Sequence, residues 1–273
     1  AKLAEAKANQ GMIYNWGAID FAGGTVVHIN AGIAGLVGAL IIGRRVGFGR
    51  EVMAPHSLTM TMIGGAMLWV GWIGFNAGSA LEATGGTALA LLNTMVATAA
   101  AALAWILVEN LGKGHPSMLG AVSGAVAGLV AITPAAGVAG PMGSIVLGFV
   151  AGIVCYVFCT TIKNTFRYDD ALDVFGVHCI GGIVGAIGTA IVAAPMLGGT
   201  GVMDYETGKI GEYVIMAQLW IQAKAVAVTL VWSGVISALI FLVISAIVGL
   251  RPSTDQEREG LDLVDHGERA YNY

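Results

Sequence analysis

The sequence predicts an all-α polytopic membrane protein with about seven transmembrane helices in its 273 residues. Only 11% of the residues are charged and 56% are apolar, whereas a soluble domain has about 25% charged residues. Six runs without Asp, Glu, Lys or Arg are each at least as long as the ~20 residues that a helix needs to cross the hydrocarbon core. These runs are 21–43, 52–81, 83–108, 114–162, 174–203 and 225–250.

The longest run divides into two helices. Within 114–162, the stretch from Thr133 to Pro141 carries two prolines and two glycines, which break a helix. The predicted helices are therefore 21–43, 58–80, 86–108, 117–133, 142–162, 174–193 and 218–249.

The composition excludes several other classes of protein. A net charge of −4 is too acidic for a nucleic-acid-binding protein, and the 41 glycines follow no collagen period. Cys155, Cys159 and Cys179 lie in apolar runs, where a thiol behaves as a small hydrophobic group. We therefore expect a membrane protein surrounded by lipid, without nucleic-acid partners and without a cofactor.

Lysine and arginine are distributed unevenly between the two sets of loops. One set and the tail include Arg44, Arg45, Arg50, Lys113, Lys163, Arg167, Arg251 and Arg258. The other set, 81–85, 134–141 and 194–217, holds only Lys209. Because cytoplasmic loops are enriched in these residues, we expect the N-terminus outside and the tail inside the cell membrane.

Three segments follow from this arrangement. Residues 1–19 form a polar start, 20–250 the transmembrane domain and 251–273 a solvated cytoplasmic tail. The start carries no initiator Met and no visible signal peptide, although its expected position is outside. We expect the chain to be a fragment or a processed product, with further spans upstream.

An internal repeat centres on two histidines. Glycines follow His28 at 32, 35 and 38 and follow His178 at 182, 185 and 188, so the offsets +4, +7 and +10 match. An aspartate also precedes each histidine at the start of its helix, Asp20 and Asp173. The predicted topology makes the two copies antiparallel, and inverted repeats place a transported species near the midplane where they meet.

The matched positions indicate that the histidines are functional, since ionisable groups inside a span are costly. The alternative is a pair of neutral imidazoles that bind neighbouring helices. No metal site is expected, because zinc takes three or four ligands and no Cys or carboxylate accompanies His28 and His178 at mid-depth.

Several stretches closely resemble the ammonium transporter (Amt/Mep/Rh) family. They are Asp20-Phe-Ala-Gly-Gly-Thr-Val-Val-His28, Gly74-Phe-Asn-Ala-Gly-Ser79-Ala, Asp173-Val-Phe-Gly-Val-His178 and Glu257-Arg-Glu-Gly-Leu-Asp262. The resemblance implies an eleven-helix fold of two inverted repeats and a long final helix, assembled as a trimer. This chain resembles the last helix of the first repeat through the tail. The family's first four helices, with the tryptophan and the aromatic residue that they supply to the outer cation site, have no counterpart here.

The resemblance also assigns roles to individual residues. His28 and His178 correspond to the twin pore histidines, Phe75 to the ring that closes the pore, and Ser79 to the hydroxyl that helps to bind the cation. Trp72 is the neighbouring aromatic residue, more often a wall residue than a gate. Asp20 corresponds to an acidic residue that supports the outer site without binding the ion, and Asp173 is its expected counterpart in the second copy.

These roles imply transport of ammonium and ammonia. Ammonium would be recruited outside and deprotonated before NH3 passes an apolar pore with two neutral imidazoles, so we expect a transporter rather than an enzyme. A PII-type signalling protein is a possible partner at the cytoplasmic face. Two alternatives remain: a sensor of the same family that binds ammonium without conducting it, and a secondary transporter for another small solute. A retinal protein is disfavoured, because it needs a lysine in the middle of its last helix with a carboxylate counter-ion.

Overall fold

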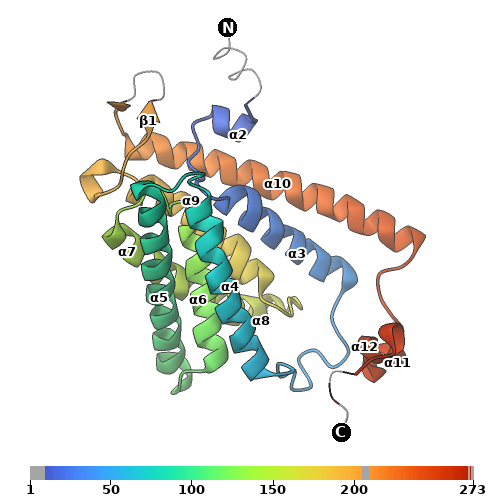
Figure 1. Cartoon of the computed structure of the whole chain (residues 1–273). Coiled ribbons are helices and arrows are strands. Elements are labelled where there is room, and N and C mark those ends of the chain that lie inside the picture. The colour runs from blue at the N-terminus through green and yellow to red at the C-terminus, as the bar shows by residue number, and fades with distance from the viewer. Residues whose placement is uncertain (1–9, 205–208, 270, 272–273) are drawn as a thin grey trace.

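The computed structural model describes residues 10–204, 209–269 and 271 (Figure 1). Most of the predicted polar segment 1–19 therefore lies outside the described residues. The described chain is helical apart from a hairpin of two short strands, β1 (Met203–Asp204) and β2 (Lys209–Ile210).

The predicted membrane helices are confirmed. Within the described residues, six helices are long and apolar enough to cross a membrane, and α6 is a shorter apolar helix between them. They are η1 (Gly24–Ile29) with α3 (Asn30–Ile42), α4 (Leu58–Gly78), α5 (Gly85–Lys113), α6 (Met118–Ile132), α7 (Pro141–Val157) with η2 (Phe158–Ile162) and α8 (Lys163–Phe166), η3 (Phe175–Cys179) with α9 (Ile180–Val192), and α10 (Ile215–Ile247). Short helices complete the described chain: α2 (Met12–Asn15), η4 (Pro195–Leu197), α11 (Thr254–Glu259) and α12 (Leu261–His266).

Two helix boundaries have clear local causes. α7 begins at Pro141, whose missing amide hydrogen is harmless at the first helical position, so the predicted break before it is correct. α5 continues to Lys113 instead of ending at 108. Glu109 accepts hydrogen bonds from Lys113 Nζ at 3.1 Å and from the Ser117 amide at 3.0 Å. The charge of Glu109 is therefore paired inside the last turns of α5.

Small residues let α5, α6 and α7 approach closely. A Cβ added to Gly128 of α6 would lie 2.7 Å from the Ala97 carbonyl oxygen of α5, and one added to Gly148 of α7 would lie 2.2 Å from it. Neither position has room for a side chain. Small residues at such contacts are typical of places where helix backbones meet in a membrane.

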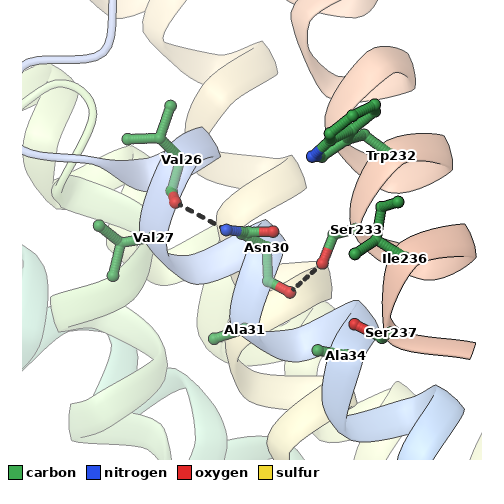
Figure 2. A pocket seen from close by; sticks show the side chains of 9 residues that line it. All are labelled: Val26, Val27, Asn30, Ala31, Ala34, Trp232, Ser233, Ile236 and Ser237. Carbon is green, nitrogen blue, oxygen red and sulfur yellow. Dashed lines mark hydrogen bonds between the residues drawn. The ribbon is translucent and has the colours of Figure 1, made fainter. Parts of the chain in front are cut away.

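The long helix α10 runs obliquely across the others and packs on α3 and α9 (Figure 1). Buried Gln222 donates from Nε2 to the carbonyls of Ile19 at 2.8 Å and Ala186 at 2.9 Å. Ser233 Oγ donates to the Asn30 carbonyl at 2.8 Å, beside a groove of about 510 Å³ between α3 and α10 (Figure 2). Hydrogen bonds from α10 therefore hold both histidine-bearing helices.

The loops gather at two opposite ends of the helices. We call the end formed by 43–57, 163–173 and 251–269 the tail face, and the end formed by 17–22, 80–84, 134–140 and the described part of 193–214 the hairpin face (Figure 1). α2 lies at the hairpin face, whereas α11 and α12 lie at the tail face (Figure 1). The described chain therefore crosses between the two faces an odd number of times, as predicted.

Ion pairs organise the tail face. Arg45 Nη2 lies 2.7 Å from Asp169 Oδ1, and Glu257 accepts the Val46 amide and the Arg251 guanidinium. Burial raises the pKa of Asp169, but the hydrogen bonds from the Arg45 side chain and backbone outweigh this effect and hold the pKa below its usual value. The tail is thus attached to the loop after α3, whereas the sequence predicted only a solvated segment.

Candidate functional site

The two histidine helices cross through reciprocal contacts. A Cβ added to Gly32, four residues after His28, would lie 2.2 Å from the Cys179 amide nitrogen. One added to Gly182, four residues after His178, would lie 2.8 Å from Ile29 Cγ1. Each glycine thus packs on the residue that follows the opposite histidine. The matched offsets in the sequence reflect this antiparallel crossing.

Both histidines lie in π-helical turns, η1 and η3. A π turn is rare and is frequently found at functional sites. The sequence analysis missed both turns.

An aspartate carboxylate accepts backbone amides at the start of each turn. Asp20 Oδ2 accepts the amides of Thr25 at 3.1 Å and Val26 at 3.2 Å. In the second copy Asp170, not Asp173, has this role: its carboxylate accepts the amides of Val174 at 3.0 Å and Phe175 at 2.7 Å. Both capping residues stand eight positions before their histidine. The expected counterpart Asp173 binds Lys163 Nζ with its carboxylate instead.

The histidine side chains meet. His28 Nδ1 lies 3.5 Å from His178 Nδ1, and the ring centroids are 5.5 Å apart. His28 is only 4% exposed. The structure therefore brings together two imidazoles that are 150 residues apart in the chain.

Thr133, at the end of α6, fixes how His28 is protonated. Its Oγ1 donates to the Leu129 carbonyl at 2.8 Å and accepts from Trp72 Nε1 at 2.9 Å. His28 Nε2 lies 3.3 Å from the same oxygen, and we assign the ring hydrogen to this nitrogen because the Thr133 hydroxyl hydrogen is donated to Leu129. His28 Nδ1 is then a lone-pair acceptor for the Nδ1 hydrogen of His178. The sequence analysis missed Thr133, which is only the last residue of the predicted helix 117–133, beside Pro134.

Aromatic rings cover His28. Trp72 stacks on it with centroids 5.0 Å apart and an interplanar angle of 20°, and Phe75 lies 6.0 Å away. A half-open groove of about 290 Å³ is lined by His28, Trp72, Phe75 and the neighbouring Val27, Leu68 and Gly71. Trp72 is therefore in direct contact with the histidine, a closer role than the sequence assigned to it.

Ser79 lies one turn beyond Phe75, at the hairpin-face end of α4. Its Oγ donates to the Phe75 carbonyl at 2.8 Å. The hydroxyl hydrogen is thus used, and the oxygen lone pairs stay available to another donor. Described contacts join Ser79 to Phe75 but not to either histidine, and Asp20 likewise acts through the backbone of η1.

His178 faces a second, more polar space. A cavity of about 760 Å³ opens at the tail face and is lined by His178, Lys163, Asp173, His56, Glu51 and Arg45, among others. Burial raises the pKa of Asp173, although the hydrogen bond and the charge of Lys163 oppose this effect. Among residues 10–204 and 209–269, no group of three or more His, Cys, Asp and Glu side chains is arranged to hold a metal ion.

Known proteins are similar to this chain in sequence and in fold. Residues 6–271 match the model of the Ammonium Transporter Family. The chain is 50% identical to an ammonium transporter of Aquifex aeolicus over 96% of this chain and 59% of that relative. It is 45% identical to an ammonium transporter of Bacillus subtilis over 96% of this chain and 63% of that relative.

Solved structures agree. The sensor Amt protein has a TM-score of 0.84 at 29% identity, covering 94% of this chain and 62% of that chain. Mep2 of Saccharomyces cerevisiae has a TM-score of 0.80 at 32% identity, covering 90% and 55%. The chain spans about three fifths of the length of the relatives that it matches. With its family match and its membrane helices, this multi-pass membrane protein belongs to the ammonium transporter family.

Proposed function

We propose that this chain forms the histidine-lined part of a pathway that transports ammonium as ammonia across the cell membrane. The observation that carries the proposal is the contact between His28 and His178 at the crossing of two antiparallel, repeat-related helices. The relatives that match are named ammonium transporters, which favours this solute over another small one.

The surroundings of the pair favour a neutral solute. Moving an ion out of water into a dry environment costs several kcal/mol unless partners replace the water. His28 is buried among Trp72, Phe75 and Thr133, and no described carboxylate contacts it. Such a site rejects the ammonium ion and admits NH3, with the histidine nitrogens as hydrogen-bond partners.

The ammonium ion is recruited at the hairpin face. Phe75 is 41% exposed and offers an aromatic surface that attracts cations. Ser79 has free lone pairs because its hydrogen is donated to Phe75. We propose that these two residues, with Trp72 as the wall below them, receive ammonium before it loses a proton, and that Asp20 supports them through the backbone.

The proposed orientation places the tail face in the cytoplasm. The bias of Lys and Arg toward the tail-face loops supports it. A PII-type signalling protein is the proposed partner at this face, and a homotrimer the proposed assembly. Both proposals come from the family resemblance.

The pathway needs a second wall. Val26 and Val27, which precede His28 in η1, are 52% and 40% exposed. We propose that the four helices that precede this helix in the family cover them, so that residues 20–250 are one part of the transport domain. Residues 1–273 alone are then expected to insert into membranes without carrying saturable ammonium flux.

A sensor function is the second candidate. The structural match to a protein named a sensor Amt protein favours it. A sensor would bind ammonium at Phe75 and Ser79 without passing it to the histidines, so it would show binding without uptake.

The test is uptake of labelled methylammonium by cells without other ammonium carriers. The segment of the Aquifex aeolicus relative that precedes its match to this chain is placed before residues 1–273, which gives a fusion transporter. We expect saturable uptake, and we expect His28→Ala with His178→Ala to abolish selective uptake while membrane insertion is retained. His115→Ala, on the exposed loop after α5, is the matched control. Wild-type uptake and selectivity in the double variant would overturn the proposal.

A further inference from the structure

One of the two aspartates near His178, Asp173, does not cap the π turn. Asp170 caps the turn that carries His178, so Asp173 is not needed there. Asp173 nevertheless adopts a left-handed backbone with φ of 56°, which is uncommon outside glycine. Among its described contacts, the Asp173 carboxylate binds the Lys163 ammonium group.

Two oxygens hold this ammonium group. Lys163 Nζ donates to Asp173 Oδ1, and the Asp170 carbonyl oxygen lies 3.4 Å from the same nitrogen. The two side chains are 21% and 31% exposed, so the pair is open to water. A carboxylate and a carbonyl that together hold an R–NH3⁺ group have the donor and acceptor pattern that a free ammonium ion needs.

The pair lies in the path of a solute. Lys163, Asp173 and His178 line the same cavity of about 760 Å³ that opens at the tail face. Arg45, the other Arg or Lys side chain of this lining, is bound to Asp169. A solute that leaves His178 toward the tail face therefore passes Asp173.

We propose that Asp173 and the Asp170 carbonyl form a site for a small primary ammonium ion, and that Lys163 occupies this site as a tethered competitor. This inference rests on the proposed function. A group held on a short tether has an effective concentration in the millimolar range. Free ammonium below that concentration is displaced by Lys163, so the exit does not retain the ion that it releases.

The competitor distinguishes this site from an ordinary ion pair. If Lys163 only neutralises charge, removing it raises the affinity of the whole cavity for any cation, and Glu51→Gln then reduces the gain as Asp173→Asn does. If Lys163 competes for a site on Asp173, only Asp173→Asn removes the gain. Lys163→Arg keeps a tethered cation in place, whereas Lys163→Met and Lys163→Gln keep the stem without it.

The test uses residues 1–273 in lipid nanodiscs and methylammonium as the probe, with binding followed by saturation-transfer NMR. We expect Lys163→Met and Lys163→Gln to lower the apparent Kd for methylammonium by about tenfold relative to the unmodified chain, and Lys163→Arg to leave it unchanged. Adding Asp173→Asn to Lys163→Met should remove the gain. Adding Glu51→Gln, in the same cavity, should not.

Equal Kd values for the unmodified chain, Lys163→Met and Lys163→Gln would overturn the proposal, as would a gain that survives Asp173→Asn. Binding is measured without flux, so the two proposals fail separately. A chain that shows this binding pattern while the fusion transporter carries no methylammonium contradicts the proposed function only. A fusion transporter that carries methylammonium while no variant gains binding contradicts this inference only.

Discussion

The two histidine helices share a backbone geometry but not their surroundings. Each has a π turn, an aspartate eight residues before the histidine and a glycine four residues after it. His28 is enclosed by Trp72, Phe75 and Thr133, whereas His178 faces a polar cavity with Lys163 and Asp173. The repeat thus conserves what brings the imidazoles together, and the differing side chains give the two faces different tasks.

The largest expected effect concerns the shared geometry. Gly32→Ala places a Cβ 2.2 Å from the Cys179 amide nitrogen, whereas Gly182→Ala overlaps less, with Ile29 Cγ1 at 2.8 Å and the Gly24 carbonyl oxygen at 2.9 Å. Overpacking costs about 1–3 kcal/mol and more where backbone must move, so Gly32→Ala is expected to lower the apparent Tm further than Gly182→Ala. Gly64→Ala, with nothing within 4 Å of its Cβ, is the control. Equal Tm values for Gly32→Ala and Gly64→Ala would show that the crossing is not tight.

The next effect concerns the enclosure of His28. Thr133→Val removes the acceptor of Trp72 Nε1 and of His28 Nε2 and leaves buried donors unpaired, which costs about 1–3 kcal/mol. Thr189→Val is the matched control, because Thr189 is equally buried and its hydroxyl bonds only the Gly185 carbonyl of its own helix. The difference between the two free energies of unfolding isolates the shared bonds. A difference near zero would mean that Thr133 does not hold the pair.

A smaller effect is expected at the hairpin face. Ser79→Ala in the fusion transporter should raise the methylammonium concentration for half-maximal uptake about tenfold, because a hydrogen bond to a charged group contributes about 1.5 kcal/mol at the lower end of its usual range. Initial uptake rates over a concentration series measure this change. If Phe75→Ala alters the apparent affinity and Ser79→Ala does not, the proposed role of Ser79 in receiving ammonium is wrong.

The smallest effect is a contrast in pH dependence between the two faces. Burial raises the pKa of Asp20 despite the backbone amides that it accepts, so its contribution to stability falls as pH rises from about 4 through the raised value. The pKa of Asp169 is lowered, because the bonds from Arg45 outweigh burial, so its contribution is present above about pH 4 and is lost as pH falls further. The difference in apparent Tm between the unmodified chain and each variant, measured from pH 3 to pH 8, is expected to change in opposite directions for Asp20→Asn and Asp169→Asn. Slopes of the same sign would contradict this assignment.

Particular residues show how far the sequence reaches. Charge-free runs predict the helices because a membrane span must be apolar along its whole length, and matched glycines predict the crossing because backbones meet there. The π turns at Gly24–Ile29 and Phe175–Cys179 have no residue pattern of their own. Thr133 gains its importance only from Trp72 and His28, which lie far away in the chain. Asp170 is predictable from the sequence, since its offset of eight from His178 repeats that of Asp20 from His28.

The most direct measurement of the central claim is a double-mutant cycle on the histidine pair. Selective methylammonium uptake is measured in the fusion transporter with His28→Ala, His178→Ala and both together. If the imidazoles act as one unit through their 3.5 Å contact, the double variant loses no more than the more severe single variant, because residues that act together are strongly non-additive. A double variant whose loss equals the sum of the two single losses, on a free-energy scale, would contradict the account.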